Sequence, residues 1–186
     1  MSTEGHEEES SRRSWLRTAM MIGGVVIVYL LWAQFATGLR LVEPAEASPA
    51  SKLVLTDESG RVVDLSAFEG QVVVVNLWAG WCGPCRREIP AINDVHDALG
   101  DRGLVILGVN LDDPSAGTLT DLKARHRIRY PVYAPAARLV GSFAVSDVIP
   151  QTWVIDRKGR VRAAHRGVVS RRSLMRVGRQ LLDEPR

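Results

Sequence analysis

The sequence predicts an α/β sandwich in which helices cover both faces of a central β-sheet. The runs 71–77 and 104–109 are mainly apolar and rich in β-branched residues, which is typical of strands buried on both faces. A helix is expected after each run, so strands and helices alternate along the chain. Further short strands are expected before the first run and near the C-terminus.

The first half of this domain begins with two short strands, at 52–55 and 62–65, which flank a turn signal at 57–60. The buried strand 71–77 follows, and a helix comes directly after it. Gly100 ends this helix and Pro90 should kink it. Its apolar residues recur at helical spacing: Ile89, Ile92, Val95 and Leu99.

The second half begins with the buried strand 104–109. We expect a helix over 116–126, an extended segment over 131–134 and a short helix over 136–143. The segments 152–155 and 161–165 are expected to pair as a hairpin around the turn 156–159. The chain ends in an amphipathic helix capped by Ser170 or Ser173, with an apolar face made of Leu174, Val177, Leu181 and Leu182.

An uncharged run precedes the domain. Residues 18–39 number 22, enough to cross a bilayer core of roughly 30 Å at about 1.5 Å per residue. Arginines before the run place residues 1–17 in the cytoplasm as a tail and the rest of the chain outside. A cleaved signal peptide is the alternative, with a small-x-small pattern at Ala45-Glu46-Ala47. Both interpretations export the domain: a single-pass membrane protein if uncleaved, a secreted or periplasmic one if cleaved.

Residues 40–51 are rich in Pro, Ala and Ser and read as a linker, so the domain is expected over 52–186. The formal net charge is only +3, although residues 157–186 carry ten Lys or Arg. No basic–aromatic repeat or nucleic-acid motif accompanies these charges. We therefore interpret them as a solvated surface and expect no nucleic-acid partner.

The only two cysteines are Cys82 and Cys85, in the segment WCGPC. A structural disulfide is a weak explanation, because closing so short a loop contributes roughly 2 kcal/mol against about 4–5 for a long one. A zinc site is also weakly supported, since zinc takes four ligands and no second pair of ligands has suitable spacing. Redox exchange is the third interpretation, and the surrounding residues favour it.

Cys82 is placed where a strand ends and a helix begins. Unpaired N–H groups and the helix dipole stabilise a thiolate there, so we expect Cys82 to have a lowered pKa and to attack disulfides. Cys85, one turn into the helix, is placed to resolve the mixed disulfide. Gly83 lets another chain approach closely, and Pro84 suits the first helical turn.

WCGPC, with a strand before it and a Pro90-containing helix after it, resembles the thioredoxin fold over nearly all of residues 52–186. The membrane anchor, the leading hairpin and the segment 108–113 resemble the membrane-anchored TlpA/ResA type. The resemblance implies a three-layer sandwich around a mixed β-sheet with an N-terminal β-hairpin extension. The uncharged run 18–39 is expected to add one N-terminal transmembrane helix that acts as a signal-anchor.

The resemblance extends to single residues. Ile149-Pro150, before a strand, is similar to the family's cis-proline loop, which packs against the first cysteine and holds a substrate peptide as an added strand. Asn76 stands where cytosolic thioredoxins carry a buried Asp, so a relay through that residue is not expected. Glu88 matches an acidic residue of the ResA-like group. We expect it to tune the thiols and to move a proton at Cys85; a glutamate merely favoured by the helix dipole is the alternative.

Two tryptophans precede the cysteines. We expect Trp81 to present an exposed face to the partner and Trp78 to pack in the core.

Proteins of the TlpA/ResA type reduce disulfides outside the cytoplasm, commonly in cytochrome c-type biogenesis, and draw electrons from a membrane thiol carrier. The resemblance thus implies a disulfide-bearing protein, such as apocytochrome c, as substrate and no bound cofactor beyond the Cys82–Cys85 pair.

The dipeptide Gly-Pro between the cysteines is that of thioredoxin, whose potential is about −270 mV, against about −120 mV for strong oxidants of this fold. That gap corresponds to roughly 7 kcal/mol for two electrons and favours a protein-disulfide reductase. A thiol oxidase or isomerase, a copper-handling module and a non-catalytic binding module stay open as alternatives.

Overall fold

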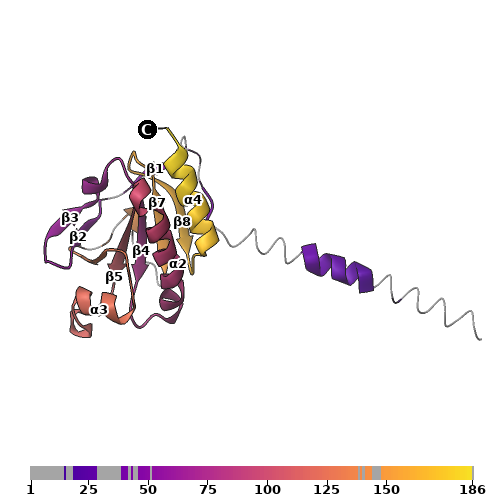
Figure 1. Ribbon diagram of the computed structural model, residues 1–186, viewed down its shortest axis with the longest axis horizontal. Helices are drawn as coiled ribbons and strands as arrows, with labels where there is room; N and C mark the ends of the chain where they lie inside the picture. The colour runs from indigo at the N-terminus through magenta and orange to yellow at the C-terminus, as the bar shows by residue number, and fades with distance from the viewer. Residues whose placement is uncertain are drawn as a thin grey trace, which may run out of the picture. The chain divides into compact units, whose positions relative to one another are not determined.

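The structure is a computed structural model that describes residues 15, 19–28, 39–41, 43, 46–50, 52–137, 139, 141–143 and 148–185. The chain divides into two compact units, 1–38 and 39–186. In the first unit, residues 19–28 are helical. The second unit contains the sheet and the helices described below (Figure 1).

Eight strands of the described chain form one mixed sheet, in the order β1-β8-β7-β4-β5-β6-β2-β3. The centre is β4 (Val72–Trp78), which is buried along its whole length. It pairs in parallel with β5 (Leu104–Asn110), which pairs in parallel with β6 (Val132–Pro135). On its other side β4 pairs antiparallel with β7 (Gln151–Ile155). The two continuous apolar runs are therefore the central parallel strands, as the sequence predicts.

The outer strands are antiparallel. On one side β7 pairs with β8 (Arg160–Arg166), and β8 pairs with the two-residue strand β1 (Ser48–Pro49). On the other side β2 (Val54–Thr56) joins β6 to β3 (Val62–Asp64). The expected leading hairpin and the expected C-terminal hairpin are both confirmed.

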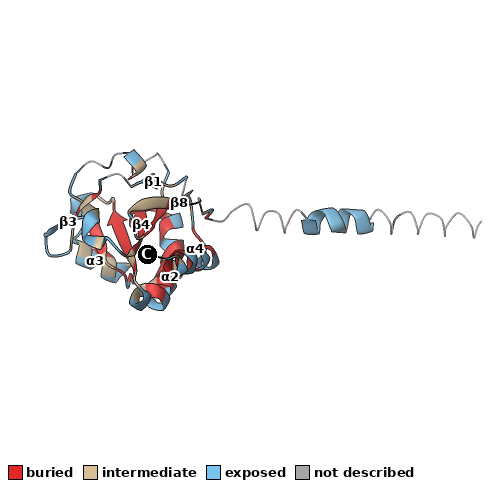
Figure 2. Cartoon of the chain, turned by 90° about the horizontal axis from the view of Figure 1, so that it is seen from above, coloured by how far each residue is buried: buried red, intermediate tan, exposed pale blue. Residues whose placement is uncertain are grey.

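Successive residues of β4 point into two different cores. Val72, Val74 and Trp78 belong to the core beneath α2 (Gly83–Leu99) and α4 (Arg171–Asp183). Val73, Val75 and Leu77 belong to the core on the opposite face. Figure 2 shows the central strand β4 buried, with α2 and α4 buried on one side and exposed on the other. This alternation is the two-residue period expected of a strand covered on both faces.

The second face differs from the expected helical layer. Its described cover comes from β2 and from two 3-10 helices, η1 (Leu65–Phe68) and η4 (Gly141–Phe143), with Leu55, Phe68 and Phe143 packed in the core. The helix expected over 116–126 is the shorter α3 (Leu119–Arg125), preceded by the 3-10 turn η3 (Pro114–Ala116). A further 3-10 turn, η2 (Gly100–Arg102), follows α2.

Local caps explain where the long helices begin and end. Ser170 caps α4, since its side chain accepts a hydrogen bond from the N–H of Ser173. At the other end of α4, the guanidinium of Arg157 donates to the carbonyl oxygens of Leu181, Leu182 and Glu184. A cation at a helix C-terminus is favourable because it meets unpaired carbonyl groups. Pro90 lies inside α2, which continues through it to Leu99.

The compact unit begins earlier than the expected boundary at residue 52. Leu39 is buried in the core, its N–H donates to Oγ of Ser173 at 2.9 Å, and Arg176 donates to its carbonyl oxygen at 2.8 Å. Ser48–Pro49, inside the expected linker 40–51, pairs with β8. The last residue of the predicted anchor and part of the predicted linker are thus packed on the domain.

Half of the predicted anchor at 18–39 lies outside the described residues, as do the tail residues 1–14, 16 and 17. No helix within the described part of the chain is long and apolar enough to span a bilayer. The anchor therefore stays a prediction.

Candidate active site

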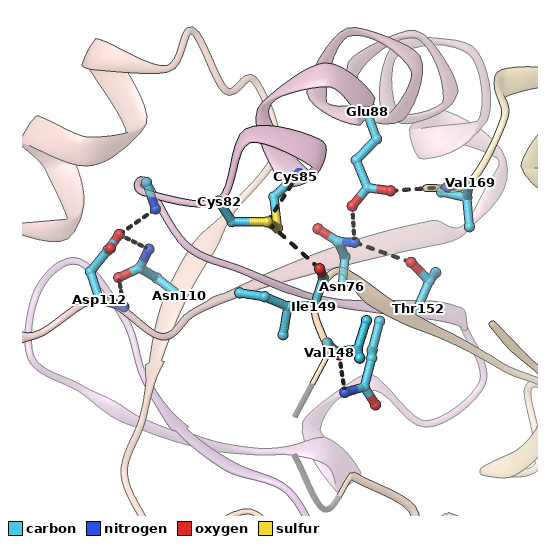
Figure 3. The surroundings of a disulfide bond; sticks show 12 residues. Asn76, Cys82, Cys85, Glu88, Asn110, Asp112, Val148, Ile149, Thr152 and Val169 are labelled. Atoms are coloured by element: carbon cyan, nitrogen blue, oxygen red, sulfur yellow. Dashed lines mark hydrogen bonds between the residues drawn. A yellow bond between two sulfur atoms is a disulfide. The ribbon is translucent and has the colours of Figure 1, made fainter. Parts of the chain in front are cut away.

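The two cysteines form a disulfide at the junction of β4 and α2 (Figure 3). Cys82 is the N-cap of α2, and its Sγ accepts a hydrogen bond from the backbone N–H of Cys85 at 3.2 Å. A helix N-terminus presents unpaired N–H groups and the positive end of the dipole. The N–H of Cys85 is thus directed at the sulfur on which a thiolate charge would be stabilised.

Exposure distinguishes the two cysteines. The Cys82 residue is 4% exposed and Cys85 is 0% exposed. Trp81, which precedes Cys82, is 72% exposed, whereas Trp78 is completely buried, as expected for each. Gly83 and Pro84 form the first two positions of α2, and Pro84 is exposed. A partner therefore meets Cys82 before Cys85.

The loop before β7 lies against the disulfide. The Ile149-Pro150 peptide bond is cis, as the resemblance implies. The carbonyl oxygen of Ile149 lies 3.7 Å from Sγ of Cys82 (Figure 3). Gln151 continues into β7, and the carbonyl oxygen of Pro150 accepts from the N–H of Gly167 at 2.8 Å. The fold thus brings Ile149 and Pro150 to Cys82 from a distant part of the sequence.

Glu88 is buried beneath the site, with an exposure of 1%. Its Oε1 accepts from Nδ2 of Asn76 at 2.8 Å, and its Oε2 accepts from the N–H of Val169 at 3.0 Å (Figure 3). Asn76 also donates to Oγ1 of Thr152 at 3.1 Å. Burial raises the pKa of Glu88 from its ordinary value of 4.5 to about 7, although both hydrogen bonds act in the opposite direction.

This pKa suits a proton carrier. A carboxyl group that titrates near neutral pH can both accept and release a proton under physiological conditions. Glu88 lies one helical turn after Cys85, on the same side of α2. Nearby, burial and the charge of Glu88 raise the pKa of Tyr130 above its ordinary range, so its phenol stays protonated.

The loop that leads to Cys82 is held by residues that the sequence analysis did not assign to the site. Oδ2 of Asp112 accepts from the N–H of Gly80 at 2.7 Å and from Nδ2 of Asn110 at 2.8 Å. A Cβ on Gly80 would lie 2.9 Å from Nε2 of His126 and 3.1 Å from Oδ2 of Asp112. Only glycine fits between these side chains without displacing one of them.

His126 packs edge-on against Trp78, with ring centroids 5.6 Å apart. Burial and the charges of Arg86 and Arg125 lower its pKa, while Asp112 acts in the opposite direction. Of the residues around Gly80, Asn110 and Asp112 lie in the segment 108–113, which resembles the TlpA/ResA type. That resemblance does not indicate their contact with Gly80. Among the described residues, no group of three or more His, Cys, Asp or Glu side chains is arranged to hold a metal ion.

A mixed sheet with a Cys-x-x-Cys pair capping the helix after its central strand defines a thioredoxin-like thiol-disulfide oxidoreductase. Residues 47–164 match the AhpC/TSA family, and the chain belongs to this family. Its similarity to curated ResA proteins supports the TlpA/ResA type.

Named proteins support the same class. The chain is 28% identical over 169 residues to the thiol-disulfide oxidoreductase ResA of Geobacillus kaustophilus. The alignment covers 90% of this chain and 95% of that protein. A secreted thiol-disulfide isomerase from Corynebacterium glutamicum superposes with a TM-score of 0.71 at 28% identity, covering 80% of this chain and 93% of that one. A DsbF homologue from Corynebacterium diphtheriae gives 0.68 at 28% identity, with 78% and 94% covered.

Proposed function

We propose that this protein is an extracytoplasmic, membrane-anchored reductase of protein disulfides, with an exported protein such as apocytochrome c as substrate. The observation that carries the chemistry is the position of the pair: Cys82 caps α2 and is reached first, and Cys85 lies buried behind it. The uncharged run 18–39 and the similarity to ResA support the location. The Gly-Pro dipeptide supports the direction.

In the first step the thiolate of Cys82 attacks one sulfur of the substrate disulfide. The Cys82–substrate bond forms, the substrate disulfide breaks, and its other sulfur leaves as a thiolate that takes a proton. The polypeptide around the substrate disulfide lies along Ile149, Pro150 and Gln151, where backbone groups beside Cys82 receive it as an added strand.

In the second step Cys85 loses its proton and attacks Sγ of Cys82. The Cys82–Cys85 disulfide forms, and the second substrate sulfur leaves as a thiolate. Two electrons have then passed to the substrate. We assign Glu88 as the catalytic base that takes the proton from Cys85, directly or through water, because it lies one helical turn after Cys85 and its raised pKa suits this transfer. A membrane thiol carrier returns two electrons to the Cys82–Cys85 pair, and no bound cofactor is required.

The test is the redox midpoint of the full-length protein in detergent, equilibrated against dithiothreitol or glutathione buffers. We expect a two-electron value near or below about −250 mV. A value above about −180 mV would overturn the assigned direction. The similarity to a secreted isomerase from C. glutamicum would then favour oxidation or isomerisation as the function.

The order of attack has a separate test. Cys85→Ser should accumulate mixed disulfides between Cys82 and its partners in the cell envelope, and their mass identifies the substrate. Cys82→Ser is the matched control and should accumulate none. Adducts on Cys82→Ser but not on Cys85→Ser would reverse the assigned roles.

A further inference from the structure

The surface around the disulfide gathers apolar side chains. Four large apolar residues are exposed within the described part of unit 39–186: Val62, Trp81, Val148 and Val168. Three of the four surround the redox pair: Trp81 precedes Cys82, Val148 precedes Ile149, and Val168 lies in the loop that bonds to Pro150 and Glu88. Apolar side chains that stay exposed beside a reactive pair favour a role in contacting the partner.

Three arginines accompany these side chains. Arg86 and Arg87 lie in the first two turns of α2, and both are exposed. A Cβ on Gly83 would lie 3.9 Å from Nη1 of Arg87, so that guanidinium sits beside the redox motif. Arg166 is exposed at the end of β8, in register with Gln151. We call Trp81, Val148, Val168, Arg86, Arg87 and Arg166 the redox face.

The fold itself does not explain these charges. A helix N-terminus favours acidic side chains, yet α2 has none in its first turn and two arginines immediately after it. None of the three arginines forms an ion pair with a described residue, whereas Arg129 pairs with Asp97 and Arg171 with Asp94. Charges that break a local rule without a structural gain are expected at functional positions.

Described acids near the site do not neutralise the face. Glu88 is buried and bonded to Asn76 and Val169, and Asp112 is bonded to Gly80 and Asn110. Asp147, which precedes Val148 in the chain, lies outside the described residues. The charge that the described part of the face presents to a partner is therefore positive.

We propose that the redox face selects disulfide partners whose cysteine is flanked by an apolar residue and by acidic side chains. The apolar residue packs against Trp81, Val148 and Val168, and the carboxylates meet Arg86, Arg87 and Arg166. This proposal rests on the proposed function, because the partner's disulfide is the bond that Cys82 attacks. Exposed ion pairs add little affinity, so the effect lies mainly in the rate of association and depends on salt.

The test uses two disulfide-bonded peptides that are identical except for Glu or Lys beside each cysteine. The reduced full-length protein in a non-ionic detergent reduces each peptide at low ionic strength and at about 1 M salt. We expect the acidic peptide to react at least about tenfold faster at low salt, within the range known for electrostatic steering. The ratio should approach one at high salt, where the Debye length is about 3 Å.

Variants locate the effect. Arg87→Glu and Arg166→Glu should each remove most of the preference, and the double variant should reverse it. Arg179→Glu changes the net charge equally from an exposed position on α4 outside the redox face, and it should keep the preference. An equal loss in Arg179→Glu would assign the effect to total charge and overturn the proposal.

The remaining outcomes are distinct. If neither peptide is reduced, the proposed function fails. If both are reduced at the same rate and salt has no effect, only the selection by charge fails. A Glu variant that slows both peptides equally and shifts the pH dependence of Cys82 alkylation would assign the arginines to thiolate stabilisation. Equal peptide rates with arginine-dependent binding to phosphatidylserine vesicles would assign them to a lipid surface instead.

Discussion

Nδ2 of Asn76 donates a 2.8 Å hydrogen bond to Oε1 of Glu88, which joins the central strand to the helix that carries the cysteines. Asn76 cannot carry a proton, so the titrating group of this buried pair belongs to α2. The amide also bonds Thr152 on β7. Glu88 is therefore held in one position beneath the disulfide while its charge state remains free to change.

The first prediction concerns stability against pH. Because the pKa of Glu88 is about 7 in the folded protein and 4.5 ordinarily, the native state binds the proton more tightly. Its contribution to stability is complete below pH 4.5 and is lost as pH rises through about 7. Glu88→Gln removes this dependence. Relative to wild type, the variant should gain up to about 3 kcal/mol of unfolding free energy between pH 4.5 and 8.

Urea unfolding of the oxidised proteins at several pH values measures this difference. Glu69→Gln is a suitable control, since Glu69 is exposed on the surface. Parallel stability curves for wild type and Glu88→Gln would contradict the raised pKa.

The second prediction concerns the thiols. If Glu88 and the cysteines share protons, the charge on Glu88 should appear in the titration of Cys82. Alkylation of the reduced protein by iodoacetamide, followed from pH 4 to 10, should show a shifted Cys82 curve in Glu88→Gln. In Glu88→Gln, the rate of turnover that depends on Cys85 should also lose its pH dependence near pH 7. A superimposable alkylation curve would restrict Glu88 to a structural role.

Much of this architecture follows from local sequence pattern. The strands 72–78 and 104–110 are visible as apolar runs, and Cys82 is visible as a helix start because the run before it stops and a Pro follows. The cap at Ser170 is equally local. These features depend on neighbours along the chain, which is the information that periodicity and capping patterns contain.

The contacts that the sequence did not predict join residues that lie far apart along the chain. Glu88 bonds the backbone of Val169, and Asp112 bonds the backbone of Gly80, contacts that bridge 81 and 32 positions. Backbone donors carry no residue-specific signal, so neither contact can be read from composition. Likewise Ser48–Pro49 has the composition of a linker and becomes a strand only because the edge of β8 offers it partners. Among the described residues, the second face is covered by β2 and by the 3-10 helices η1 and η4, which helical periodicity does not indicate.

The third prediction concerns Asp112. Its carboxylate accepts from the N–H of Gly80 and from the side chain of Asn110, and Asp112→Ala leaves both donors without this acceptor. We expect a loss of about 1–3 kcal/mol in unfolding free energy. Amide hydrogen exchange at Gly80 should accelerate in the variant because the bond that protects it is lost.

Asp113→Ala is the neighbouring control, since the side chain of Asp113 only caps η3 by accepting from the N–H of Ser115. It should leave exchange at Gly80 unchanged. Equal protection of Gly80 in wild type and Asp112→Ala would show that the carboxylate does not hold the loop.

The fourth prediction concerns the buried guanidinium of Arg162 and its partner Glu184. Arg162 is 1% exposed, and its guanidinium donates to both carboxylate oxygens of Glu184 at 2.6 and 2.8 Å. The hydrogen bond from Arg162 lowers the pKa of Glu184, so its stabilising effect is present above the ordinary value of 4.5 and is lost as pH falls through the lower folded value.

Glu184→Gln should therefore reduce the unfolding free energy by about 1–2 kcal/mol at pH 7, a value limited by the partial exposure of Glu184. The difference from wild type should shrink as pH falls below 4. Asp183→Asn is the matched control, because Asp183 pairs with Arg102 in solvent and such pairs contribute roughly 0–1 kcal/mol. If the two variants lose the same stability at pH 7, Asp156 alone suffices to neutralise Arg162, which it approaches at 3.5 Å.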